Sequence, residues 1–195
     1  MKRKIIAVAV VVALGIIGYA FGSTWETRTN AAGYLNDLLT IQPGKSTYDD
    51  AKAFAFRHHL QPSVRTPQCA PEKCDWDFVV ENKALERVLL FSKVTFGATI
   101  KTEDGQVMIV SAGMEKQGRV PVYAHASERS FQLEGERSYT TALYRNEENL
   151  VYRVDVKLVP GVTAEERKRA FAFNLNCMVL PLLCRDARDL LPTVK

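Results

Sequence analysis

The sequence predicts an α+β fold, in which an antiparallel sheet of about five to six strands is flanked by N-terminal and C-terminal helices. Three observations predict it: an uncharged N-terminal run, helix-type spacing of apolar residues towards both ends, and strand-type alternation between them. Helices, then strands, then a helix are typical of an α+β domain with its helices gathered on one side of the sheet. A β-sandwich with peripheral helices is the alternative. In both cases one transmembrane or signal helix precedes the domain.

The N-terminal run, residues 5–22, carries no charge and follows the basic residues Lys2, Arg3 and Lys4. A helix of this length spans about 27 Å at about 1.5 Å per residue, close to the hydrocarbon thickness of about 30 Å. A cleaved signal peptide is the competing interpretation, because the stretch Gly18–Gly22 has small residues at the spacing that a signal peptidase needs. The run is longer than the roughly 7–15 residues of a signal h-region, which favours an uncleaved anchor.

The distribution of charge predicts where the rest of the chain lies. Basic residues before the span should keep the N-terminus in the cytoplasm, so residues 23–195 would face outward from the cell (inner) membrane as a single-pass protein. Cleavage would instead give a secreted or periplasmic protein. Of the 26 basic residues three precede the span, which leaves 23 against 22 acidic residues, and this near-balance predicts no nucleic-acid partner. We divide the chain into an anchor or signal (1–22), a short connector (23–30) and a single extracytoplasmic α+β domain (31–195).

Four cysteines form two local pairs, Cys69 with Cys74 and Cys177 with Cys184. An even number of cysteines in an exported chain predicts disulfides, and local pairing is the simplest of the three connectivities. A zinc site is disfavoured because the second pair is spaced more widely than a zinc knuckle, and a redox site because neither pair is C-x-x-C. Such short loops should mainly fix local shape.

Helix signals stand on both sides of the predicted sheet. Apolar residues recur at helical spacing over 31–39. Thr47, followed three residues later by an aspartate, predicts the N-cap of a helix over 48–59. Residues 61–75 should form a loop that the first cysteine pair closes. A capping box then begins a helix over residues 163–176.

Strand signals fill the middle of the chain. Apolar and polar residues alternate there, and Asp104-Gly105 is typical of a hairpin turn. Clean alternation predicts a sheet with one face in water, as in antiparallel sheets. The predicted strands are residues 76–80, 94–101, 107–110, 119–125, 139–144 and 152–158.

The tripeptide Gly44-Lys45-Ser46 ends the phosphate-binding loop of P-loop NTPases, but the rest of that motif is missing. The loop needs a glycine at the position of Leu39, and a strand before it where this sequence predicts a helix. Pro43 and Gly44 instead end one helix, and the following residues cap the next. No nucleotide partner is expected.

No residues form a recognisable catalytic, cofactor-binding or metal-binding motif, so none is assigned to such a site. His58 and His59 would diverge on a helix. His125 lies near Ser127 and Glu128 without an accompanying motif.

Three tyrosines, Tyr139, Tyr144 and Tyr152, could form an aromatic face for a ligand, but the preference of strands for aromatic residues explains them as sheet packing.

The sequence therefore predicts a membrane-anchored or secreted envelope protein that acts as a non-catalytic binding module. Its expected partners are the membrane, through residues 5–22, and an envelope protein or small ligand, without a cofactor. The alternative is an exported hydrolase that uses His125, or a thiol oxidoreductase with one reduced cysteine pair. A cavity that joins a histidine to a carboxylate or hydroxyl would favour the enzyme.

Overall fold

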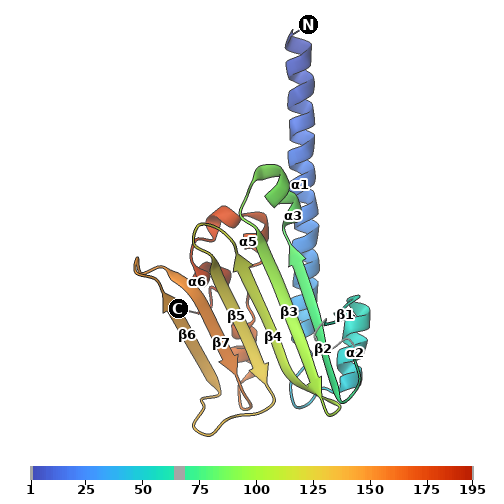
Figure 1. Ribbon diagram of the computed structural model, residues 1–195, viewed down its shortest axis with the longest axis vertical. Helices are drawn as coiled ribbons and strands as arrows, with labels where there is room; N and C mark the ends of the chain where they lie inside the picture. Colours follow the sequence, from blue (N-terminus) through green and yellow to red (C-terminus); the bar gives the residue numbers. More distant parts are fainter. Residues whose placement is uncertain (1, 64–68, 195) are drawn as a thin grey trace.

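The protein is a mixed seven-stranded sheet with helices on one face and one long helix projecting from it (Figure 1). The computed structural model describes residues 2–63 and 69–194. The α+β fold predicted from the sequence is confirmed, with slightly more strands than the five or six expected.

The elements follow one another in the order helices, strands, helices. The helices are α1 (Lys2–Leu38), α2 (Tyr48–Arg57), α3 (Lys83–Leu89), α4 (Ala164–Ala170), α5 (Asn176–Val179) and α6 (Ala187–Leu190), with a 3₁₀ turn, η1 (Pro181–Leu183). The strands are β1 (Gln61–Pro62), β2 (Lys73–Glu81), β3 (Val94–Glu103), β4 (Gln106–Lys116), β5 (Val122–Arg129), β6 (Tyr139–Arg145) and β7 (Val151–Leu158).

The strand order is β1-β2-β3-β4-β5-β7-β6, and one neighbouring pair is parallel. All other neighbours are antiparallel, whereas β5 and β7 run in the same direction. The sequence predicts only antiparallel strands. The parallel pair arises because β6 lies at the edge of the sheet and β7 returns into the place between β6 and β5.

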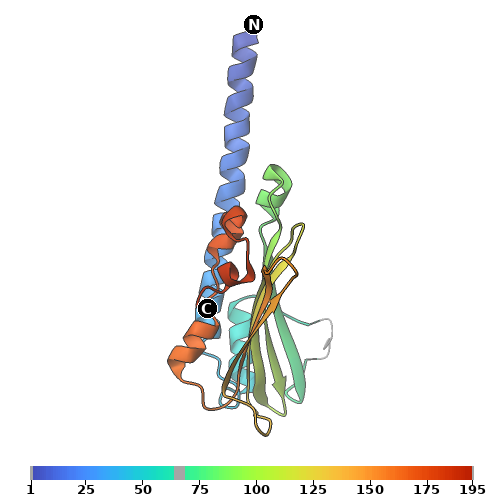
Figure 2. The ribbon, with the colours of Figure 1, turned by 90° about the vertical axis from the view of Figure 1, so that its left-hand side faces the viewer.

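One face of the sheet is covered by helices and the other is open (Figure 2). The alternation along β3 explains this, because Val94, Phe96, Ala98 and Ile100 are buried while the residues between them are only partly covered. Side chains of successive strand residues point to opposite faces, so each strand supplies one apolar row to the core. The polar rows of the sheet together form the open face.

Helix α1 has a free part and a packed part. From Ile6 to Tyr19 its residues are exposed, and the helix is long and apolar enough to cross a membrane. From Ala20 onward one side of it is buried against the domain, where Tyr34 stacks on Phe78 of β2 with ring centroids 4.0 Å apart. Residues 23–30, expected as a connector, are helical and join the two parts without a break.

The predicted loop over 61–75 contains more regular structure than expected. Residues 61–62 pair with β2 as the short strand β1, and β2 already begins at Lys73. Residues 64–68 of this predicted loop lie outside the described residues.

The C-terminal helix is shorter than predicted, because α4 ends at Ala170 rather than near Asn176. Phe171, Phe173 and Leu175 are all buried. Residues two apart lie about 200° apart around a helix, so a continued helix could not bury all three on one side.

Helix α3 is not predicted from the sequence, because its N-cap residue, an asparagine, is not followed by a capping box: the N3 position is Leu85. The side chain of Asn82 makes no capping bond. It instead accepts a hydrogen bond from the backbone N–H of Val94 at 2.7 Å and donates to the carbonyl oxygen of Met178 at 3.3 Å. The side chain of Asn82 therefore bonds residues that are distant in the sequence and does not cap α3.

Candidate functional site

Two neighbouring glycines leave a hollow in the open face of the sheet. Gly97 of β3 pairs with Gly113 of β4, and the next residues across the sheet are His125 of β5 and Asp155 of β7. The missing side chains leave a cavity of about 380 Å³ on the side of Asp155 and one of about 230 Å³ towards β2, and both reach His125. We call the two cavities together the glycine hollow. Its remaining walls include Val79, Thr95, Ser111, Glu115, Tyr123 and Arg153.

Local packing does not require a glycine at either position. A Cβ on Gly97 would lie 3.4 Å from the carbonyl oxygen of Phe78, and one on Gly113 would lie 3.4 Å from that of Ala124, both at ordinary contact distance. Glycine weakens the interior of a strand and often marks a place where a ligand or another backbone approaches closely. The glycines therefore matter for the space that they leave above the sheet.

Asp155 is a buried carboxylate with one unpaired oxygen. The residue is only 7% exposed, and its Oδ2 accepts a hydrogen bond of 2.8 Å from Nε of Arg153. Its Oδ1 is buried and has no donor among the residues that the structure describes. A buried unsatisfied polar group costs about 1–3 kcal/mol, and more when it is charged. A ligand that brings an N–H or O–H to this oxygen would recover that free energy.

The ionisable groups around Asp155 give the glycine hollow a net negative charge. The pKa of Arg153 is raised, chiefly by its hydrogen bond to Asp155, and its guanidinium lies 5.5 Å from the ring centre of Tyr144. The pKa of His125 is lowered, chiefly because the sheet and its neighbours displace water from one side of the ring, and the charge of Asp155 opposes this shift only in part. His125 is therefore mainly neutral at pH 7. Three carboxylates, of Asp77, Glu115 and Asp155, then line the glycine hollow with a single guanidinium, and the charge of Lys157 acts on His125 from beyond the lining.

A larger cavity of about 510 Å³ lies between the α1–α2 turn, the end of β5 and the start of α4. The buried Arg167 donates there to the carboxylate of Glu128 and to the carbonyl oxygens of Leu39 and Ile41. The Glu166 carboxylate accepts from the N-cap backbone of α4. Because these polar groups satisfy one another, this cavity is a weaker candidate than the glycine hollow.

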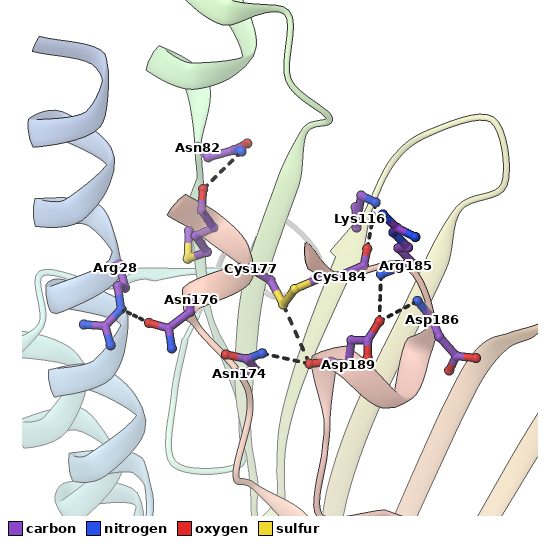
Figure 3. The surroundings of a disulfide bond; sticks show 11 residues. Arg28, Asn82, Lys116, Asn174, Asn176, Cys177, Cys184, Arg185, Asp186 and Asp189 are labelled. Carbon is purple, nitrogen blue, oxygen red and sulfur yellow. Dashed lines mark hydrogen bonds between the residues drawn. A yellow bond between two sulfur atoms is a disulfide. The ribbon is translucent and has the colours of Figure 1, made fainter. Parts of the chain in front are cut away.

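The four cysteines pair locally, as the sequence predicts, and lie outside the glycine hollow. The Cα atoms are 4.6 Å apart in Cys69–Cys74 and 5.7 Å apart in Cys177–Cys184. The second disulfide joins the start of α5 to the residue after η1, where Nζ of Lys116 donates to the carbonyl oxygen of Cys184 at 2.7 Å (Figure 3).

The histidines occupy separate environments. His58 lies 3.0 Å from the carboxylate of Asp37, whereas His125 borders the glycine hollow. Ser127 shares the open face with His125, but Glu128 points to the covered face and pairs with Arg167, so the polar residues near His125 in sequence do not assemble. Within residues 2–63 and 69–194 no three potential metal ligands lie close enough to hold an ion.

Two other groups of residues singled out in the sequence, Gly44–Ser46 and the three tyrosines, make contacts that stabilise the fold. Gly44–Ser46 is a turn between two helices, where the Gly44 N–H donates to the carbonyl oxygen of Val107 at 2.8 Å. Tyr139 packs against the core, while Tyr144 and Tyr152 have ring centres 6.5 Å apart. The three tyrosines therefore do not line one ligand site.

Of the residues that line the glycine hollow, the sequence singles out only His125. A glycine inside a strand pattern is a local signal of a bulge or of close approach, and Gly97 carries it, whereas Gly113 lies three residues beyond the strand predicted over 107–110. Their meeting with His125 and Asp155 depends on the register of four strands, which only the fold supplies.

Comparisons of this chain with protein-family models, curated proteins and solved structures find no match.

Proposed function

We propose that this protein is a single-pass, membrane-anchored extracytoplasmic protein whose open sheet face binds a ligand in the glycine hollow. The observation that supports a ligand site here is the buried Oδ1 of Asp155, an acceptor without a donor among the described residues. Asp155 lines a cavity that is already formed, as is usual for small-molecule sites.

The anchor is supported by the continuity of α1. Ala20 is fully buried, and the ring of Phe21 lies 6.5 Å from that of Phe91. Signal cleavage after Ala20 would remove the buried Ala20, and cleavage after Gly22 would remove Phe21 as well, so the domain uses residues that a signal peptide would lose. The basic N-terminus favours an N-in orientation, and the two disulfides favour an oxidising compartment outside the cytoplasm.

The ligand class follows from the charge of the glycine hollow. Three carboxylates, Asp77, Glu115 and Asp155, line the hollow with one guanidinium that is already bonded, and the neighbouring His125 is mainly neutral. A cationic N–H donor, such as an alkylammonium or guanidinium group, satisfies Oδ1 and balances the charge. The ring of Tyr123 adds an aromatic wall against which such a cation can lie.

The test uses the full chain in lipid nanodiscs, labelled with ¹⁵N only in its 11 glycines. Butylammonium and butylguanidinium should shift the Gly97 and Gly113 amide signals, and butyrate should not. Gly33 and Gly105 are internal controls, because they lie outside the hollow.

A matched pair of variants completes this experiment. Asp155→Asn should abolish the response to the cations, while Asp104→Asn, at an exposed hairpin turn, should keep it. Equal shifts with butyrate, or an undiminished response of Asp155→Asn, would refute the proposed ligand class.

A second candidate function is hydrolysis, because the glycine hollow does join a histidine to a carboxylate. His125 and Asp155 are paired neighbours, although the carboxylate is bonded to Arg153 and not to the imidazole. An exported esterase or amidase activity that His125→Gln abolishes, without loss of folding, would favour this function over binding alone. The redox alternative needs a free thiol, so thiol titration of the native protein tests it.

A further inference from the structure

The end of the domain from which the free part of α1 projects carries exposed leucines. Helix α3 and the α5–η1 segment lie at this end (Figures 1 and 2). Leu90 is 89% exposed at the end of α3, and Leu180, Leu182 and Leu183 are 45%, 62% and 71% exposed in the other segment. We call these four residues the leucine rim. Exposed apolar residues that gather in one region mark an interaction surface.

Helix α1 sets the depth of the leucine rim relative to a bilayer. From residue 6 to residue 19 the free part measures about 21 Å at about 1.5 Å per residue, which is short of a hydrocarbon thickness of about 30 Å. The missing length has to come from the part of α1 that is already packed against the domain. Phe21 lies there beside Phe91, and the exposed Trp25 follows one turn later, as is typical of the membrane–water interface.

The α5–η1 segment, with three of the four rim leucines, is held rigidly in this place. The disulfide Cys177–Cys184 links its two ends, and Nζ of Lys116 donates a hydrogen bond to the carbonyl oxygen of Cys184 (Figure 3). At its start, Nε of Arg28 on α1 donates to Oδ1 of Asn176 at 2.9 Å. The fold thus keeps these leucines facing out instead of letting them collapse onto the core.

Exposed basic side chains flank the leucine rim. Arg87 lies on α3, Arg119 in the β4–β5 loop and Arg185 directly after the second disulfide. Leucines with arginines at the same end of the domain are a combination that binds at the boundary of headgroups and acyl chains, where apolar faces sink by about 5–10 Å.

We propose that the leucine rim inserts into the outer leaflet of the same bilayer that α1 spans, with lipid acyl chains as its partner. This inference rests on the anchor in the proposed function and is independent of the glycine hollow. The domain then has two attachments to the membrane, a span and a shallow apolar contact. With both, the sheet is held upright on the membrane surface and does not swing about α1.

The test is photo-crosslinking of the full chain in phosphatidylcholine–phosphatidylglycerol vesicles. Benzoylphenylalanine is placed at position 182 or 90 of the leucine rim, or at the control position 133. Leu133 matches Leu182 in residue type and exposure, at 59% against 62%, but lies in the β5–β6 loop at the opposite end of the domain. Lipid adducts, measured by mass spectrometry, should be at least tenfold more abundant at 182 and 90 than at 133.

Equal yields at positions 182 and 133 would overturn the proposal. So would adducts at 182 that join two protein chains, since they would make the leucine rim an interface between copies. A non-reducing gel verifies that each variant keeps its disulfides.

A second measurement separates failure of the leucine rim from failure of the anchor. In a Trp76→Phe background, Trp25 is the remaining tryptophan of the two in the chain. Lipids brominated on their acyl chains should quench its fluorescence. Quenching of Trp25 without lipid adducts at 182 would leave the anchor in place and refute the rim, whereas an unquenched Trp25 would refute both.

Discussion

Replacing Arg167 by alanine should destabilise the domain by several kcal/mol. This side chain is buried and donates to the carboxylate of Glu128 on β5 and to the carbonyl oxygens of Leu39 and Ile41 just after α1. It therefore joins α4, the sheet and the end of the anchor helix through one guanidinium.

The magnitude follows from the groups that the substitution leaves behind. Removing one partner of a buried ion pair costs about 3–5 kcal/mol, because the other charge stays buried without compensation. Two carbonyl oxygens also lose a donor, although water can reach them from the adjoining cavity and replace part of the loss. We expect about 4 kcal/mol, a large fraction of the 5–15 kcal/mol of a typical domain.

The assay is urea unfolding of the full chain in micelles, followed by the fluorescence of the buried Trp76. Arg169→Ala is the matched control on the same helix, since its ion pair with Glu165 is exposed and should contribute at most about 0.5 kcal/mol. The double variant Arg167→Met with Glu128→Leu should recover most of the loss, because an apolar pair can replace a buried ion pair. A loss below about 1 kcal/mol for Arg167→Ala, or no recovery in the double variant, would show that this reasoning is wrong.

Three further predictions concern other parts of the chain. Gly33→Ala should raise the free energy of unfolding by about 1 kcal/mol, because the position is helical and an added Cβ meets nothing within 4 Å; thermal unfolding measures this. The pKa of His125 lies below its usual 6.5, so the unfolded chain takes up this proton first and stability falls as the pH drops through the range below about 6.5. His125→Gln should flatten that part of the curve in urea unfolding from pH 8 to pH 5. Replacing Cys177 and Cys184 by serine should cost roughly 2–2.5 kcal/mol on the chain-entropy model and should speed proteolysis between them.

The parts of the fold that could be predicted from the sequence are those with a local cause. The capping box at Thr47 starts α2 and the one at Thr163 starts α4, because each threonine satisfies backbone groups within three residues. Alternation predicts the strands for the same reason, since the side-chain direction repeats every two residues. Both signals lie in neighbouring residues and need no knowledge of the rest of the chain.

The parts that could not be predicted depend on contacts between distant residues. Asn82 starts α3 while its side chain bonds Val94 and Met178, so its role depends on residues distant in sequence and not on a capping box. The glycine hollow needs the parallel register of β5 and β7, which places His125 beside Asp155 although 30 positions separate their numbers. Strand order is a property of the whole sheet, and no residue in these strands encodes it locally.

The position of the glycine hollow along the strands connects the binding site to the membrane. Gly97 is three residues from the start of β3 at Val94, about 10 Å at about 3.3 Å per residue, and β3 starts at the end of the sheet nearest the free part of α1 (Figure 1). If the leucine rim meets the outer leaflet, the hollow opens sideways only a short distance above the lipid headgroups. A large globular ligand would then collide with the bilayer before it reached Asp155. The geometry therefore favours a small cationic ligand, or a cationic group carried on a flexible chain close to the membrane surface.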